Sequence, residues 1–360
     1  MRSVLTAALL VLVWAIPAHA RSPAGWMLEL ELDGRKIEGM PLAWDREGVC
    51  LLGRDGRLWQ FAASEAKEYR KTSSRFQSYS TSELRAMLLR DLGERYEVSG
   101  TGHYLVAHPR GERSQWRERF EDLYRSFVHY FSVRGFDLEE PPCPLIGVVC
   151  RNQREFFEYS ASRGLPAGYG VLGSYSVESN RIVLYDVSGG TSDAAGWEDT
   201  ASTIIHEATH QTAFNTGVHS RFTTPPLWVA EGLATMFEAS GVYNSRSFTG
   251  EGDRINRQRL RHFNELVVPQ HKPELLAALV ASDRLFRTHP SVAYSTAWAL
   301  TFYLMETDRG KYADYLARTA ARPPFQAYTA AERTADFTAV FGDDWRMLEA
   351  RLLRFIAGLK

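Results

Sequence analysis

The stretch IIHEATH at residues 204–210 contains the pattern H-E-x-x-H and decides the fold that we expect. Residues four positions apart lie on one face of an α-helix, so the imidazoles of His206 and His210 can converge on one zinc ion. Glu207 lies about 100° further round the helix, where it can act as a general base without being a ligand. Apolar residues recur around it at helical intervals, and Gly217 suits the end of the helix. The stretch therefore predicts a metal-binding helix.

A second predicted helix, PPLWVAEGLATMFE at residues 225–238, supplies a third ligand. A third ligand is needed because a catalytic zinc ion normally has three, and H-E-x-x-H alone occurs by chance in on the order of one such chain in a hundred. Glu231 is the predicted ligand, and His219 is a rival that follows the first helix rather than lying on it. Glu238 shares a helix face with Glu231, where it is either a solvated residue or a hydrogen-bond partner of a ligand histidine.

The two stretches together resemble the gluzincins, the thermolysin-like superfamily of zinc metallopeptidases. The resemblance is carried by H-E-x-x-H at residues 206–210 and by W-x-x-E-G-x-A at residues 228–234. The pattern with a third histidine fails, because Ala213 and Thr216 stand where its glycine and histidine would be. Within the superfamily, the chain is most similar to exported bacterial proteins of largely unassigned function. The resemblance covers roughly residues 96–304, and it implies one catalytic Zn²⁺ and peptide or protein substrates.

The resemblance also implies roles for two further regions. Gluzincins commonly bind the substrate backbone along an edge strand just before the zinc helix, and Gly173, Ser174 and Tyr175 stand in the matching region. Many gluzincins stabilise the tetrahedral intermediate with a tyrosine downstream of the glutamate ligand. Tyr294 has the matching position, although it could instead simply cap and pack its helix. Motifs of the aminopeptidase branch are missing, so we expect an endopeptidase.

The predicted reaction is hydrolysis of a peptide bond by a zinc-activated water, with Glu207 as general base. The alternative is a catalytically inactive gluzincin-fold protein that keeps the zinc and binds peptides or cell-envelope partners. An intact Glu207 counts against this alternative. In a third interpretation, the N-terminal β region recognises the partner and the helical part is only a scaffold.

The hydrophobic pattern predicts an α+β chain in three parts. Residues 26–61 alternate with a period of two between turn signals, which predicts a small all-β module of SH3-like type over residues 21–66. The polar residues 67–80 are the predicted linker. A zincin-like peptidase domain follows over residues 81–360. It divides into a mixed α/β subdomain at 81–217, with the edge strand and the zinc helix, and a mostly helical subdomain at 218–360.

The first 20 residues have the order of a secretory signal peptide. Arg2 provides a positive charge, residues 4–16 are an apolar run, and residues 18–20 fit the cleavage pattern. The run is shorter than the roughly 20 residues of a membrane span, although an uncleaved anchor helix is the alternative. We therefore expect an exported protein, periplasmic or secreted, without a membrane span after cleavage. A net charge of −1 without a basic stripe argues against nucleic acid as a partner, and the oligomeric state is left open.

Three cysteines do not form a disulfide framework. Cys143 and Cys150 flank an apolar run that is typical of a strand, and such a strand separates their Cα atoms by roughly 23 Å. A disulfide needs Cα atoms within about 7 Å. Cys50 could pair with either of the other two.

Overall fold

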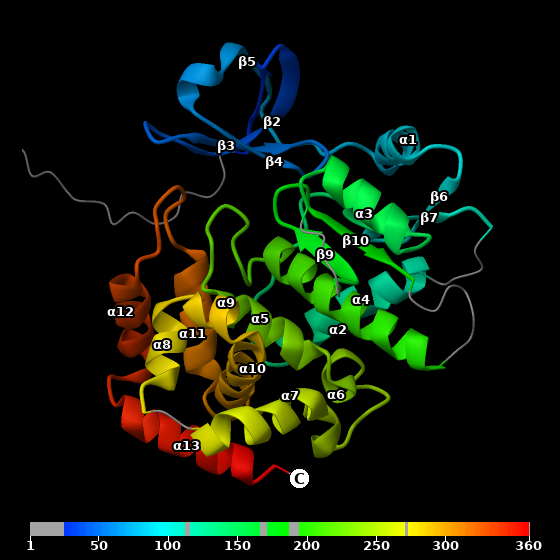
Figure 1. Cartoon of the computed structure of the whole chain (residues 1–360). Helices are drawn as coiled ribbons and strands as arrows, with labels where there is room; N and C mark the ends of the chain where they lie inside the picture. The colour runs from blue at the N-terminus through cyan, green and yellow to red at the C-terminus, as the bar shows by residue number, and fades with distance from the viewer. Residues whose placement is uncertain (1–24, 112–115, 166–170, 187–193, 271–272, 360) are drawn as a thin grey trace, which may run out of the picture.

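The computed structural model describes residues 25–111, 116–165, 171–186, 194–270 and 273–359 of the chain. For residues 194–200 it describes the backbone only. The predicted signal peptide at residues 1–20 lies outside these ranges. Two β-sheets and a large group of helices make up the described part of the chain, which is α+β, as the sequence predicts (Figure 1). No helix within the described ranges is both long enough and apolar enough to cross a membrane.

The N-terminal sheet consists of five antiparallel strands in the order β4-β3-β2-β1-β5. Its inward-facing residues alternate along the strands, as the period of two predicts, and Leu28, Leu30 and Leu51 belong to its core. Asp33 and Gly34 both have positive φ, 50° and 72°, as a two-residue hairpin turn requires. The strands are β1 (Met27–Leu32), β2 (Arg35–Trp44), β3 (Val49–Gly53), β4 (Leu58–Phe61) and β5 (Lys67–Ser73).

The predicted linker at residues 67–80 is wrong in its first half. Lys67–Ser73 forms β5, which pairs antiparallel with β1 at the edge of the sheet. All of its residues except Ser73 are exposed, so the strand has no apolar alternation by which it could be predicted. Main-chain hydrogen bonds to β1, rather than side-chain burial, hold it in place. The sheet order places β4 and β5 at the two edges, and the SH3-like classification stays a prediction.

The central sheet has the order β6-β7-β8-β10-β9, with β7, β8 and β10 parallel and the edge strands β6 and β9 antiparallel to their neighbours. Leu105 and Ala107 of β7 face a core with helices α1 and α3, whereas Tyr104 and Val106 face a core with α2 and α4. Helices therefore cover both faces of this sheet. The elements are α1 (Thr81–Leu92), β6 (Tyr96–Gly100), β7 (Tyr104–Pro109), α2 (Trp116–Ser132), β8 (Leu145–Cys150), α3 (Gln153–Ser162), β9 (Gly173–Ser176), β10 (Arg181–Tyr185) and α4 (Ala194–Asn215).

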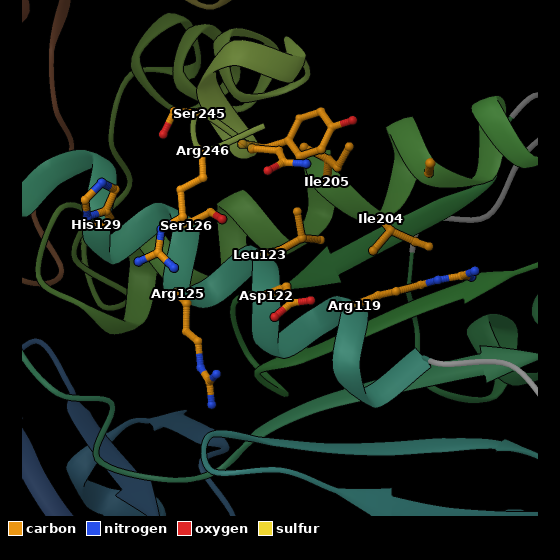
Figure 2. A pocket seen from close by; sticks show the side chains of 13 residues that line it. Arg119, Asp122, Leu123, Arg125, Ser126, His129, Ile204, Ile205, Ser245 and Arg246 are labelled. Carbon is orange, nitrogen blue, oxygen red and sulfur yellow. The ribbon is translucent and has the colours of Figure 1, made fainter. Parts of the chain in front are cut away.

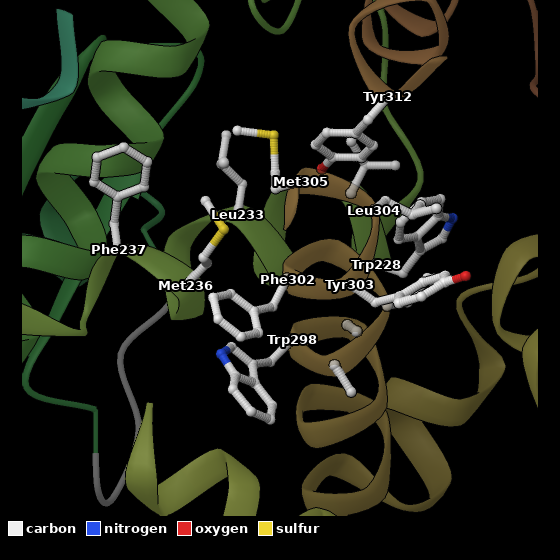
Figure 3. Packing of buried hydrophobic residues seen from close by; sticks show 14 of the residues in the cluster. Trp228, Leu233, Met236, Phe237, Trp298, Phe302, Tyr303, Leu304, Met305 and Tyr312 are labelled. Atoms are coloured by element: carbon white, nitrogen blue, oxygen red, sulfur yellow. The ribbon is translucent and has the colours of Figure 1, made fainter. Parts of the chain in front are cut away.

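The C-terminal part is helical and is built around α10, whose residues are buried almost all round. Figure 3 shows Trp298 and Phe302 of α10 close to Met236 of α5 in this core. The helices are α5 (Leu227–Phe237), α6 (Ser240–Tyr243), α7 (Arg257–His262), α8 (Leu275–Ala281), α9 (Arg284–Thr288), α10 (Pro290–Thr307), α11 (Arg309–Ala320), α12 (Ala330–Phe341) and α13 (Trp345–Ala357), with short 3-10 and π segments at Glu251–Arg254, Phe263–Val267 and Val268–Gln270.

Arg221 joins the N-terminal sheet to the central sheet. Its buried guanidinium donates from Nη2 to the carbonyl oxygens of Gly56, at 2.8 Å, and Val177, at 2.7 Å. Gly56 lies in the turn between β3 and β4, and Val177 follows β9. The backbone N–H of Leu58 also donates to the Glu178 carbonyl at 2.8 Å. The β3–β4 turn is thus fixed to the β9–β10 turn.

All three cysteines are free and buried. The pairing that the sequence left open for Cys50 is therefore not formed. Burial raises the pKa of the Cys50 thiol to about 11, so the thiol stays protonated at neutral pH and acts as a packing group.

Gly232 lies where α5 and α10 approach each other closely. A Cβ atom at this position would lie 2.3 Å from Thr301 Oγ1 and 2.7 Å from the Ala297 carbonyl oxygen, and real Cβ contacts are longer than 3.0 Å. The glycine of the W-x-x-E-G-x-A pattern therefore permits this helix contact. Because Glu231 precedes Gly232, the same contact determines where the Glu231 carboxylate lies.

Substitution Gly232→Ala should lower the free energy of unfolding by about 1–3 kcal/mol, because the added methyl group overpacks the α5–α10 contact. Urea denaturation of both proteins would measure the difference. The matched control is Gly310→Ala in α11, where an added Cβ meets nothing within 4 Å. This control should be neutral or stabilising by up to about 1 kcal/mol. Equal effects of the two substitutions would contradict the packing argument.

Candidate metal centre

Helix α4 presents His206 and His210 on the side opposite its contact with the central sheet. Ile204 and Ala208 of the same helix belong to the core beneath that sheet, and positions two residues further on point the other way on a helix. The Nε2 atoms of His206 and His210 lie 3.1 Å apart. The structure therefore brings together the two imidazoles of the H-E-x-x-H pattern.

Glu231 on α5 completes a triangle of potential ligand atoms. Its Oε2 atom lies 3.2 Å from His206 Nε2 and 3.6 Å from His210 Nε2. Around a tetrahedral zinc ion with bonds of about 2.0–2.1 Å, neighbouring ligand atoms are about 3.3 Å apart. The three separations therefore match one face of such a tetrahedron and leave a fourth position for another ligand. Within the described part of the chain, this is the group of His, Cys and acidic residues that could hold a metal ion.

The position of the proton on His206 also suits the binding of a cation at this site. His206 Nδ1 lies 2.8 Å from Glu238 Oε1, and a carboxylate oxygen only accepts, so Nδ1 carries the proton. In the neutral imidazole, Nε2 then has its lone pair directed toward Glu231. Glu231 Oε2 is buried and accepts no hydrogen bond from the described residues. A proton or a metal ion is needed between these atoms, and the donor set of two imidazoles and one carboxylate suits zinc.

A chain of contacts from α7 holds His206 in this orientation. Glu238 follows α5 directly, and its second oxygen, Oε2, accepts a hydrogen bond from Asn256 Nδ2 at 2.8 Å. Asn256 also donates to the Thr235 carbonyl at 2.8 Å, and its side chain caps the N-terminus of α7. The sequence left Glu238 either as a solvated residue or as a hydrogen-bond partner of a ligand histidine. The structure shows it in contact with the candidate ligand His206. Asn256 was missed by the sequence reasoning, since an asparagine before a helix signals a cap and says nothing of a distant glutamate.

A cleft of about 270 Å³ lies beside His206 and Glu207, and Gly173 at the start of the edge strand β9 borders it. The backbone at Gly173 lies close against α4, since a Cβ there would lie 2.8 Å from Thr203 Cγ2. The residues that line the cleft come from the start of β9 and the segment before it, from α4, from the end of α5 and from α7. They are Val171, Leu172, Gly173, Ser202, Thr203, His206, Glu207, Glu238 and Arg259.

The other two residues of the predicted edge strand do not appear in the cleft lining. The Tyr175 hydroxyl donates to Asn180 Oδ1 at 2.9 Å, and its ring packs on Phe214 at 5.8 Å between centroids. The Tyr175 side chain is therefore used within the fold. Ser174 lies in β9 opposite Val183. Substrate contact by β9 stays a prediction that involves its backbone.

Tyr294 lies near the metal centre, at the start of α10. Burial raises the pKa of its hydroxyl above the ordinary value, and the charges of Glu231 and Glu207 raise the pKa further. The phenol is therefore protonated at neutral pH and can donate a hydrogen bond. The guanidinium carbon of Arg259 lies 5.2 Å from the centre of its ring. A catalytic role for Tyr294 stays a prediction.

His219 is buried outside the ligand triangle. Burial lowers the pKa of its imidazole to about 3, with a smaller contribution from His210. Its ring packs edge-on against Phe214, with the ring centres 5.2 Å apart. A neutral histidine packed in this way is a core residue, and the rival assignment of His219 as third ligand gains no support.

A larger cavity, of about 390 Å³, lies behind α4. Figure 2 shows that Ile204 and Ile205 of α4, Leu123 of α2 and Arg246 after α6 line it. None of the three candidate metal ligands borders this cavity. Size alone therefore does not choose between the two cavities, and the smaller one is lined by His206 and Glu207.

The affinity for zinc should fall as the pH falls. In the metal-free chain, burial alone would lower the pKa of His206, but its contacts with Glu231 and Glu238 raise that pKa well above the ordinary value. Zinc must displace this proton, so each displaced proton should weaken binding about tenfold per pH unit below that pKa. Competition with a chromophoric chelator between about pH 6 and pH 8 measures the slope. An affinity independent of pH would contradict the assignment of His206.

Substitution Glu238→Ala should weaken zinc binding by about 10–100-fold, because His206 loses the carboxylate that orients its ring. The matched control is Glu158→Ala on α3, whose exposed side chain pairs with Arg154 on the surface. Isothermal titration of zinc into each protein would measure both affinities. If the two variants bind zinc equally well, Glu238 is not part of the metal centre.

Comparisons with known proteins find one family and a distant structural likeness. The profile of a family described as a protein of unknown function, DUF1570, matches residues 200–326, which include the three candidate ligands. No curated protein matches the chain. Among the solved structures that are similar is a point mutant of an M1 zinc metallopeptidase from Deinococcus radiodurans, with a TM-score of 0.40 and 14% identity. The match covers 73% of this chain and 50% of that one, so the chain spans about half the length of this neighbour.

Proposed function

We propose that this chain is an exported, zinc-dependent metallopeptidase of the gluzincin type that cleaves peptide bonds within a chain. The observation that carries the proposal is the convergence of His206 Nε2, His210 Nε2 and Glu231 Oε2, with Glu207 lining the same cleft as His206. Two imidazoles, one carboxylate and an adjacent free carboxylate are the groups that hydrolysis at a zinc centre requires. The edge strand β9 along the same cleft suits an extended peptide.

Each residue of the site has a defined part in this proposal. A zinc ion held by the three ligands would lower the pKa of a water to about 7 and polarise the scissile carbonyl. Glu207 accepts the proton of the attacking water and delivers it to the nitrogen of the leaving amine. Tyr294 donates a hydrogen bond to the carbonyl oxygen as that oxygen becomes negative. Glu238 keeps the His206 ring in its orientation through Nδ1.

Substitution Glu207→Gln should lower turnover by at least about 10²-fold while zinc stays bound, because the general base is lost and the ligands are kept. The measurement is cleavage of an unbiased peptide library by zinc-loaded protein, with mass spectrometry of the products. Glu158→Gln on the surface of α3 is the matched control and should cleave like the original protein. Cuts should also vanish when a chelator removes the metal.

A library that stays uncut, with one zinc bound per chain, would contradict the proposed activity and favour the zinc-containing binding protein. Equal turnover of the Glu207→Gln variant at full zinc occupancy would remove Glu207 from the mechanism.

Substitution Tyr294→Phe should lower turnover by about 10²–10³-fold, since one donor to the developing negative charge is lost. The Tyr294 hydroxyl is also a hydrogen-bond partner of the candidate ligand Glu231, so turnover is compared at full zinc occupancy of both proteins. Tyr69→Phe, at an exposed position of β5, is the control for the loss of a hydroxyl. Unchanged turnover in the Tyr294 variant would make this residue a packing residue of α10.

A further inference from the structure

Arg259 brings a positive charge into the metal cleft. It lies on α7, where Asn256 caps the helix and accepts a hydrogen bond from the Arg259 backbone N–H at 3.1 Å. The Arg259 side chain is 19% exposed and lines the same cavity as His206 and Glu207. The N-cap that holds Glu238 therefore also places this guanidinium beside the candidate ligands.

The guanidinium of Arg259 lies over the ring of Tyr294, with its central carbon 5.2 Å from the ring centre, and this contact with its face leaves its N–H donors available. Its Nη2 atom lies 3.9 Å from Glu238 Oε1, which is beyond hydrogen-bond distance. Both oxygens of Glu238 already have closer partners, His206 Nδ1 and Asn256 Nδ2, each at 2.8 Å. The Nε atom of Arg259 is buried and donates to no acceptor among the described residues. A buried donor without an acceptor is rare in folded proteins and calls for an explanation.

Among the described residues that line the cleft, the other walls contribute no lysine or arginine. The segment just before β9 contributes two apolar residues, β9 contributes Gly173, and α4 contributes two hydroxyl groups next to His206 and Glu207. A peptide lying along β9 would have the metal ligands at its scissile bond and Arg259 on the α7 side. Arginine presents a planar fork of N–H donors that matches a carboxylate.

We propose that Arg259 binds a carboxylate of the substrate next to the scissile bond. This inference rests on the proposed peptidase function and deepens it by naming the substrate class: peptides that carry a carboxylate at the cut. An acidic side chain there agrees with cleavage within a chain, whereas a C-terminal carboxylate there would make the enzyme a carboxypeptidase and replace the endopeptidase assignment. The two sources share one chemistry and differ in position. Arg259 is then a specificity-determining residue, and the metal centre is complete without it.

The experiment uses the full chain, loaded with zinc, in the Glu207→Gln background so that bound peptides stay intact. The probe is a synthetic peptide set in matched pairs, glutamate against glutamine at each position and free acid against amide at the C-terminus. Immobilised protein is incubated with the set, and mass spectrometry measures the enrichment of each peptide. The comparison is between this protein and the same protein carrying Arg259→Gln, Arg259→Lys or Arg261→Gln. Arg261 is an exposed residue of the same helix and is the matched control.

The expected result is an enrichment of the charged member of a pair by about 10-fold or more, as for a hydrogen bond to a charged group. Arg259→Gln should abolish this preference, Arg259→Lys should keep part of it, and Arg261→Gln should keep all of it. Preference for glutamate within the peptide would identify the acidic side chain, and preference for the free acid would identify the C-terminus. Zinc affinity should be the same in all of these proteins.

Two results would overturn the inference. One is equal binding of both members of every pair by the protein with Arg259 intact. The other is a fall in zinc affinity in Arg259→Gln with the charge preference kept, which would make Arg259 a positioning residue for Glu238. Charge-selective binding without any cleavage by the protein with Glu207 intact would uphold the role of Arg259 and contradict the peptidase function instead.

Discussion

Three electron-pair donors held within 3.6 Å of one another repel unless a cation lies between them, and the site at His206, His210 and Glu231 is built on this constraint. Each donor comes from an element that the fold fixes independently. Helix α4 is held by its apolar face against the central sheet, and α5 is held by its close contact with α10 at Gly232. The packing of two large cores thus holds the three donor atoms close together, and a proton or a metal ion between them would relieve their repulsion.

The same packing arranges the surroundings of the metal centre. Asn256 ties Glu238 to the start of α7, and α7 in turn places Arg259 in the cleft. On the other side, the β9 edge lies close against α4 because Gly173 has no side chain. Arg221 fixes the turn after β9 to the N-terminal sheet. The N-terminal sheet therefore supports the strand that we expect to bind the substrate, which gives this sheet a structural role beside the recognition role considered from the sequence.

Local patterns predicted the parts of the site that depend on local geometry. The i and i+4 spacing of His206 and His210 is enough to place two imidazoles together, and the apolar periodicity around them predicts the helix. Contacts between distant segments could not be predicted in this way. Glu238 was left between two interpretations because its partner lies on another helix, and Asn256 and Arg259 were missed for the same reason. The exposed side chains of β5 predict a linker, because they show no apolar alternation. Main-chain pairing with β1 makes the segment a strand, and such pairing leaves no mark in the side-chain pattern.

The most direct test of the central claim is X-ray absorption at the zinc edge of the purified, zinc-loaded full chain. The spectrum should show nitrogen and oxygen neighbours at about 2.0–2.1 Å, with the multiple-scattering features of two imidazoles. Substitution Glu231→Ala should remove one oxygen neighbour, or replace it by solvent, and leave both imidazoles. A sulfur neighbour at about 2.3 Å, or fewer than two imidazoles in the unchanged protein, would contradict the three-ligand centre.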